Sequence, residues 1–253
     1  MAYTIAVAGK GGVGKTSIAC EIIRVLRDRG ETPILAVDAD PNSTLDETLG
    51  LEVKETVADV LEESQTVVKN LPPGVSKERY MEERIHSTVV ESTGVDLFVM
   101  GRPGGPGCYC YPNMLLRKHL DAISANYKRI VMDNEAGMEH ISRRTSRNVD
   151  LLLIVSDIST PALRAAGRII NMAKQLKLGI GKAGLLVNRV TDGIPETSRK
   201  EIENTGLEVF GFVPHDEEVL ARSIAGKPLL ELPPESPSLK AVAEILGKLL
   251  PHS

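Results

Sequence analysis

A glycine-rich stretch near the N-terminus, "GKGGVGKTS" at residues 9–17, combines the residue types that bind a phosphate group. Gly9 is followed by four residues and then by Gly14, Lys15 and Thr16. Glycines at this spacing let backbone N–H groups turn toward phosphate oxygens, while the lysine reaches the β- and γ-phosphates and the hydroxyl binds Mg²⁺. A plain glycine turn is the alternative. The residues expected to contact phosphate are Gly9, Gly11, Gly12, Val13, Gly14, Lys15, Thr16 and Ser17.

Two acidic stretches could supply the remainder of a magnesium-nucleotide site. "VDADPN" at 37–42 contains Asp38 and Asp40, and "IVMDNEAG" at 130–137 contains Asp133 and Gly137. Each follows an apolar run, so we expect these residues at the carboxyl edge of a sheet, where open α/β folds bind ligands. Either aspartate taken alone could instead cap the N-terminus of a helix.

The loop "GRPGGPGCYCYPN" at residues 101–113 holds two of the three cysteines, Cys108 and Cys110. Two thiolates cannot complete a tetrahedral metal site, but a two-fold axis would bring together two from each of two subunits. The alternative is a pair of small buried hydrophobic residues. For Cys20, within "TSIACEII", a structural role is expected, and the five histidines, including His140, show no ligand spacing.

These candidate residues need a scaffold, and the apolar pattern predicts one. Short apolar runs alternate with amphipathic, helix-like segments, which predicts one doubly wound α/β domain over residues 1–253. Its mostly parallel sheet would have about seven or eight strands flanked by helices. Residues 51–95 are the least regular and predict a helical insertion. The apolar runs are 3–8, 33–38, 96–100, 129–133, 151–156, 184–188 and 208–213.

Composition excludes several other classes of protein. The net charge is −4, with no Trp, 3 Phe and 5 Tyr, which argues against a nucleic-acid binder. The first ten residues lack the charged and apolar regions of a signal peptide, and no segment approaches the ~18 apolar residues of a membrane span. We therefore expect a cytoplasmic protein that binds neither nucleic acid nor membrane.

The string "GKGGVGKT", with a second lysine at Lys10, resembles the deviant Walker A signature of the ParA/MinD-like P-loop ATPases. The resemblance covers nearly the whole chain. It implies Mg²⁺-dependent ATP hydrolysis in a homodimer, in which Lys10 crosses the interface to the partner's nucleotide. Lys10 and Lys15 would both be catalytic. A solvated loop lysine is the alternative for Lys10.

The same resemblance assigns roles to the acidic stretches. Asp40 would orient or deprotonate the attacking water, and Asp38 would belong to the same switch, close to the magnesium ion. Asp133 would hold Mg²⁺ through water, and the Gly137 N–H would reach the γ-phosphate.

The family's adenine pocket matches Asn188 and the stretch "GFVPHD" at 211–216. The Asn188 side chain can both donate to and accept from an adenine edge. Backbone near Val213 and Pro214 would complete the pocket, with Asp216 beside it. A strand-ending asparagine is also a common turn residue, which is the alternative for Asn188.

The order of P-loop, "DADP", "CYC" and "DNEAGMEH" resembles the nickel-insertion ATPases of the CooC type. This resemblance implies a metallochaperone that serves carbon monoxide dehydrogenase or acetyl-CoA synthase. Nucleotide- and metal-promoted dimerisation would hold Ni(II) between Cys108 and Cys110 of both subunits. Zn(II) would bind the same thiolates in vitro.

Two other interpretations remain open. The nitrogenase iron protein and related reductases also bridge a dimer with cysteines, but theirs lie far apart in sequence, and iron–sulfur scaffold ATPases usually carry Cys-x-x-Cys. A ParA/MinD-like spatial organiser would bind membrane or DNA. A membrane form needs a basic amphipathic tail, whereas residues 238–253 predict an ordinary core-packing helix.

Overall fold

The computed structural model describes residues 2–42, 44–67, 71, 76–102, 123–134 and 148–250. Within these ranges the chain forms one seven-stranded sheet. Most of the predicted apolar runs are buried on both faces of the sheet, whereas the run at 208–213 is partly exposed. The strands overlap all seven predicted runs. They are β1 (Tyr3–Gly9), β2 (Ile34–Asp38), β3 (Val95–Val99), β4 (Arg129–Asp133), β5 (Asn148–Ser156), β6 (Gly179–Val190) and β7 (Glu208–Pro214).

The sheet has the order β3-β2-β4-β1-β5-β6-β7, and every pairing is parallel. Strands β2 and β3 lie on one side of β1, and β5 to β7 lie on the other. The carboxyl end of β1 therefore lies where the winding of the chain changes direction, which is the usual ligand site of open α/β sheets. The predicted α/β domain with a parallel sheet is confirmed.

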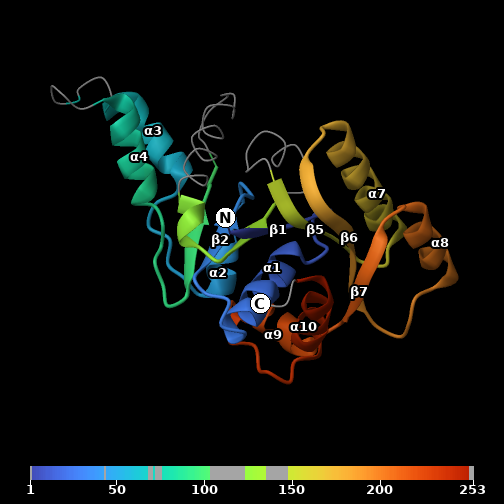
Figure 1. Ribbon diagram of the computed structural model, residues 1–253. Helices are drawn as coiled ribbons and strands as arrows, with labels where there is room; N and C mark the ends of the chain where they lie inside the picture. The colour runs from blue at the N-terminus through green and yellow to red at the C-terminus, as the bar shows by residue number, and fades with distance from the viewer. Residues whose placement is uncertain are drawn as a thin grey trace.

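Helices cover both faces of this sheet (Figure 1). One face carries α1 (Lys15–Asp28), α2 (Leu45–Leu49), α9 (Glu217–Ile224) and α10 (Pro237–Leu249). The other face carries α3 (Val57–Val67), α4 (Lys77–His86), α7 (Thr160–Gln175) and α8 (Glu196–Asn204). Two separate apolar cores result, one on each side of the sheet.

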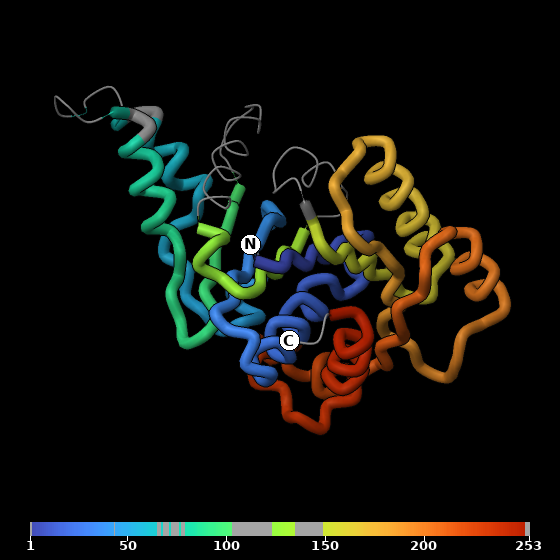
Figure 2. The backbone as a smooth tube through the Cα atoms, in the orientation of Figure 1, coloured from blue at the N-terminus to red at the C-terminus, as the bar shows by residue number. Residues whose placement is uncertain are grey.

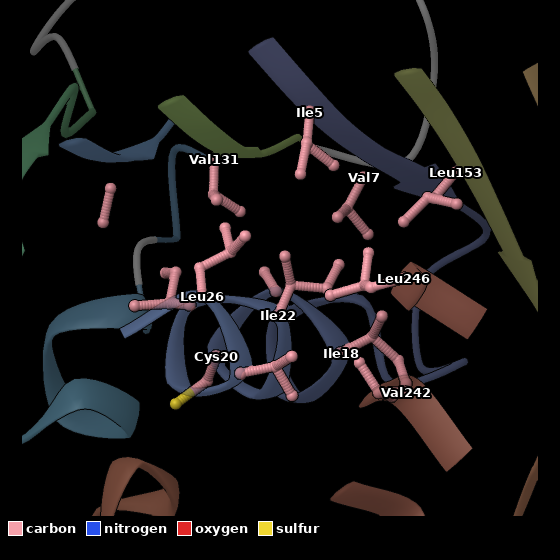
Figure 3. Close-up of a cluster of buried hydrophobic side chains, with 14 of the residues drawn as sticks. Ile5, Val7, Ile18, Cys20, Ile22, Leu26, Val131, Leu153, Val242 and Leu246 are labelled. Atoms are coloured by element: carbon pink, nitrogen blue, oxygen red, sulfur yellow. The ribbon is translucent and has the colours of Figure 1, made fainter. Parts of the chain in front are cut away.

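Alternating residues of β1 divide between the two cores. Ile5 and Val7 point toward α1, whereas Ala6 and Ala8 belong to the opposite core, as the two-residue period of a strand requires. Figure 3 shows Ile18 and Ile22 of α1 packed beneath Ile5 and Val7. The helix that opens at the glycine-rich loop is thus fixed against the central strand.

Helix α10 packs against α1, although the two lie at opposite ends of the chain (Figure 2). Its apolar residues Leu239, Val242, Ile245 and Leu246 are buried in the same core. The expectation of a core-packing C-terminal helix therefore holds for residues 237–249. Among the described helices, none combines the length and apolar character that a bilayer crossing needs.

The expected insertion at residues 51–95 contains a helical pair, α3 and α4, which lie side by side. Met81 and Ile85 of α4 are buried against the sheet. Arg84 forms ion pairs with Glu55 and Glu63 across the pair. The predicted break at "LPPG", residues 71–74, lies largely outside the described residues.

Cys20 lies in the core on the α1 side of the sheet, on the face of α1 turned away from β1, as expected for a structural cysteine (Figure 3). Its side chain is fully buried, and its thiol donates to the Thr48 carbonyl oxygen at 3.5 Å. Burial raises the pKa of this thiol well above its usual value. Burial thus disfavours the thiolate that a metal ligand or a reactive nucleophile needs.

Candidate nucleotide site

The loop between β1 and α1 has a backbone path that only glycine can follow at two positions. A Cβ at Gly9 would lie 2.2 Å from the Val155 carbonyl oxygen. Gly14 has φ of 92°, and a Cβ there would lie 2.5 Å from Asn188 Nδ2. These close contacts explain the spacing of the motif: Gly9 passes against β5, and Gly14 passes against β6.

Helix α1 begins at Lys15 without a side-chain cap, since the N-cap residue is Gly14. Its first backbone N–H groups are therefore left for an anion, and the helix dipole favours negative charge at the same point. Lys15 is mostly buried beside this end. The loop has the features of a phosphate site, and the predicted contacts of residues 9–17 with phosphate remain a prediction.

Thr16 and Asp133 meet at the head of α1. The Thr16 hydroxyl donates to Asp133 Oδ2 at 2.6 Å, and Asp133 is buried at the carboxyl end of β4. Asp133 Oδ1 has no hydrogen-bond partner among the described residues. Burial raises the pKa of Asp133 to about 6, while the Thr16 hydrogen bond and the Lys15 charge oppose that rise.

An unpartnered carboxylate oxygen beside a hydroxyl is the oxygen-donor set that Mg²⁺ prefers when it also binds phosphate. The residues at the head of α1 therefore fit a magnesium ion. Thr16 and Asp133 come from separate parts of the sequence, as the predicted site requires.

Asp38 lies next to Asp133 in the sheet, since the two are register partners on β2 and β4. Its carboxylate is fully buried and accepts from the backbone N–H groups of Asp40 at 3.0 Å, Thr44 at 3.1 Å and Leu45 at 3.0 Å. Burial raises its pKa to about 7, and the hydrogen bond from Leu45 opposes the rise. Asp38 thus caps the start of α2, and its predicted place near magnesium remains a prediction.

Asp40 and Lys10 are more accessible than Asp38. Asp40 is partly exposed, and its Oδ1 accepts from the backbone N–H of Asn42 at 2.9 Å. The Asp40 charge also contributes to the raised pKa of Asp133. Lys10 is exposed on the glycine-rich loop, and its predicted role across a dimer interface remains a prediction.

A cavity of about 220 Å³ adjoins the loop on the side of β6 and β7. Ser17, Asn188, Pro214 and Asp216, all predicted nucleotide-site residues, line it. Val219 and Leu220 of α9 provide apolar walls. Val213 is fully buried in the core and is not among the residues that line the cavity.

Asn188 fastens the glycine-rich loop to the sheet. Its Nδ2 donates to the Val13 carbonyl oxygen at 3.0 Å, and its Oδ1 accepts from the Arg189 N–H at 2.9 Å. Arg189 in turn donates to the Gly12 carbonyl oxygen at 2.9 Å. Asn188 thus holds the loop in place, and its predicted contact with adenine would use the second hydrogen of the amide group.

Asp216 holds the opposite wall of the cavity. Its Oδ1 accepts from Glu218 N–H at 2.9 Å, which caps α9, and its Oδ2 accepts from the Ser236 hydroxyl at 2.6 Å. Burial alone would raise the pKa of Asp216, but these hydrogen bonds outweigh it and hold the pKa below its usual value. Asp216 positions α9 beside the cavity.

Glu21 and Arg189 are among the cavity residues that the sequence analysis missed. Glu21 had a detectable signal: it is a lone acidic residue within the apolar stretch "SIACEII", one helical turn after Ser17. The only sequence signal for Arg189 was its position directly after Asn188.

The predicted metal ligands Cys108 and Cys110, the predicted γ-phosphate contact Gly137, and His140 lie outside the described residues. Within the part of the chain that the structure describes, no group of three or more His, Cys, Asp or Glu side chains is placed to hold a metal ion.

Comparisons with known proteins agree with the phosphate loop and the fold. The chain is 40% identical over 248 residues to an uncharacterized ATP-binding protein of Methanocaldococcus jannaschii, covering 97% of this chain and 98% of that protein. It is 30% identical over 241 residues to the carbon monoxide dehydrogenase accessory protein CooC of Rhodospirillum rubrum, covering 91% of this chain and 90% of that protein.

The fold matches a MinD cell division protein of Aquifex aeolicus with a TM-score of 0.70 at 23% identity, covering 100% of this chain and 98% of that chain. The profile of the family described as "CobQ/CobB/MinD/ParA nucleotide binding domain" matches residues 4–229. The chain therefore belongs to the CobQ/CobB/MinD/ParA family of nucleotide-binding proteins.

Proposed function

We propose that this protein is a magnesium-dependent ATPase whose nucleotide-driven dimerisation is coupled to the binding and delivery of a metal ion. The observation that carries the ATPase proposal is the contact between Thr16 and Asp133 at the head of α1. It joins a phosphate loop to a buried carboxylate that still has a free oxygen among the described residues. That combination suits a site for a nucleotide triphosphate with its magnesium ion.

The reaction proposed is the transfer of the γ-phosphoryl group of ATP to water. The water oxygen forms a bond to the γ-phosphorus, the bond to the bridging oxygen breaks, and ADP leaves. Lys15 and the N–H groups of the loop hold the phosphates, while Asp40 orients the water and accepts its proton. Magnesium, held by Thr16 and Asp133, supplies charge neutralisation when bound.

The metal-delivery proposal is supported by the CooC relative and by the sequence around Cys108 and Cys110. Two thiolates from each subunit would form a four-sulfur site on the dimer axis. Ni(II) is the proposed cargo, and carbon monoxide dehydrogenase or acetyl-CoA synthase is the proposed client. Zn(II) competes for such thiolates, so metal preference in vitro is a poor guide.

Deletion of the gene in its host tests the metal-delivery proposal. We expect candidate nickel enzymes purified from the deletion strain to contain less nickel and to regain it when the wild-type gene is returned. The gene for the Asp40→Ala variant should not restore it, because delivery depends on turnover. Normal nickel content in the deletion strain would overturn the metal-delivery proposal.

A ParA/MinD-like spatial organiser is the second candidate, favoured by the likeness of fold to MinD. The apolar face of α10 is already packed in the core, so this described helix offers no free membrane-binding face. Sedimentation with liposomes and with DNA separates the two candidates, because the organiser would sediment with one of them in ATP. An iron–sulfur carrier would instead yield a brown protein with acid-labile sulfide after anaerobic purification.

A further inference from the structure

Glu21 is a buried carboxyl group that the phosphate chemistry does not use. It lies on α1, one helical turn after Ser17, and the side chains of both residues line the cavity beside the loop. Its exposed fraction is only 1% in an otherwise apolar stretch of helix. Burying a carboxyl group is unfavourable, so its presence at this position needs a partner or a function.

Only one of the two Glu21 oxygens has a partner. The Ser238 hydroxyl donates to Oε1 at 3.0 Å, and the Ser236 hydroxyl donates to Asp216 Oδ2 at 2.6 Å. Each serine has a single hydroxyl hydrogen, so these two bonds use the hydrogens that the pair could offer. Glu21 Oε2 remains buried with no hydrogen-bond partner among the described residues.

The cavity has the size and lining of a site for part of a nucleotide. Its volume of about 220 Å³ is below the roughly 300–1,000 Å³ of a pocket for a whole small ligand. Val219 and Leu220 provide apolar surface for a flat ring, and Ser17 joins the cavity to the phosphate loop. A nucleotide with its phosphates in the loop would therefore direct its base toward Glu21.

We propose that Glu21 in its ionised form selects the base of the nucleotide: its Oε2 accepts a hydrogen bond from the 6-amino group of adenine and repels the 6-carbonyl oxygen of hypoxanthine or guanine. The proposal rests on the ATP-binding function proposed above and adds the residue that distinguishes ATP from other purine triphosphates. Ser238 holds the carboxyl group through Oε1, whereas the buried Oε2 has no hydrogen-bond partner among the described residues.

The protonation state of Glu21 sets the conditions for a test. Burial raises the pKa of this carboxyl to about 8, with the Ser238 hydrogen bond opposing the rise and the Asp216 charge adding to it. Above that pH the group is ionised and can only accept hydrogen bonds. Binding should therefore be measured at about pH 8.5, where most of the carboxyl group is ionised and most of the hypoxanthine base keeps its N1 proton.

Calorimetric titration of the wild-type protein with ATP and inosine triphosphate tests the base contact, since both have the same ribose and phosphates. We expect ATP to bind at least about tenfold more tightly, as for a hydrogen bond to a charged group. Purine riboside triphosphate, which lacks a 6-substituent, should also bind about tenfold more weakly than ATP. Equal affinities for all three would overturn the proposal without any variant.

Glu21→Gln should reduce the preference for ATP over inosine triphosphate to about threefold or less, because its amide can donate to the carbonyl oxygen. Glu244→Gln is the matched control, because Glu244 is exposed on α10 and the substitution removes the same charge. This variant should keep the wild-type preference. An unchanged preference in folded Glu21→Gln would overturn the assignment of Glu21.

Inorganic tripolyphosphate separates this inference from the function on which it rests. It should bind the wild-type protein and Glu21→Gln equally, since it contacts only the loop, and it should bind Lys15→Ala more weakly. Failure of tripolyphosphate and ATP to bind the wild-type protein would overturn the nucleotide function itself. Binding of tripolyphosphate with no preference among the bases would overturn only the role of Glu21.

Discussion

The Thr16 hydroxyl donates to Asp133 Oδ2 at 2.6 Å, although the two residues lie 117 positions apart in the sequence. The contact exists because β1 and β4 are neighbours in register, with Val7 opposite Asp133. The glycine-rich loop after β1 then brings the start of α1 over the end of β4. A magnesium ion at this point would be held by one group from each segment.

Asp133→Asn tests the magnesium assignment, since it keeps the size of the side chain and removes its charge. We expect Mg²⁺-dependent ATP binding to weaken at least about tenfold, because a charged oxygen ligand is lost. Calorimetric titration with and without Mg²⁺ measures this effect. Asp192→Asn is the control, because it makes the same substitution at an exposed position, and it should leave Mg²⁺-dependent ATP binding unaltered. The same magnesium dependence in Asp133→Asn and wild type would contradict the assignment.

Lys15→Ala and Asp40→Ala should separate phosphate binding from turnover. Lys15→Ala removes a cation from the phosphate loop and should weaken ATP binding. Asp40→Ala should bind ATP normally and lose at least about a hundredfold in hydrolysis, because the attacking water is no longer positioned. Phosphate release and equilibrium binding measured on the same samples distinguish the two effects. Wild-type hydrolysis by Asp40→Ala would remove Asp40 from the mechanism.

Lys10→Ala should leave a folded monomer that binds nucleotide but dimerises poorly with ATP. The reason is that Lys10 is exposed on the loop, where its charge can reach phosphate across an interface. Sedimentation velocity with ATP measures the dimer, and the exposed Lys227→Ala is the charge-matched control. If both variants dimerise like wild type, Lys10 has no role at the interface.

Glu21 should make the stability of the nucleotide-free protein depend on pH. Its pKa is about 8 in the folded protein against an ordinary value of 4.5, so the folded chain holds a proton that the unfolded chain releases. The stabilisation that the folded protein gains from protonated Glu21 is fully present below about pH 4.5 and is lost as the pH rises through about 8.

Relative to Glu21→Gln, wild-type stability should therefore fall by up to about 1.4 kcal/mol per pH unit between those limits. Chemical denaturation of both proteins across this range measures the difference. Asp38 and Asp133 titrate in both proteins, so their effects cancel in the comparison. Parallel stability curves would mean that Glu21 is already ionised at neutral pH.

The sequence was sufficient to predict the strands and the glycine-rich loop, because both depend on local patterns. Buried parallel strands are continuous apolar runs, and the glycines of the loop are required by the backbone path itself. The order of acidic stretches after β2 and β4 also placed Asp38 and Asp133 at the same edge of the sheet.

The remaining features of the site depend on contacts that no local pattern reveals. Asp38 caps α2 only because the chain turns back after Asp40, and Asn188 reaches Val13 across 175 positions. Glu21 meets Ser238 across 217 positions, so its single unpartnered oxygen could not be predicted from the helix that carries it. Such roles arise from tertiary packing.

The cysteine pair gives the last prediction: one Ni(II) or Zn(II) per dimer, held by Cys108 and Cys110 of both subunits. Only the dimer offers four thiolates, so metal should itself favour dimerisation, and acid should weaken binding because each ligand must lose a proton. Cys108→Ala or Cys110→Ala should abolish tight binding and spare ATP binding. Cys20→Ala should keep both, since Cys20 is buried in the core beside α2. Elemental analysis after gel filtration measures the stoichiometry, and a full metal content in the Cys108→Ala/Cys110→Ala double variant would leave the loop without a metal role.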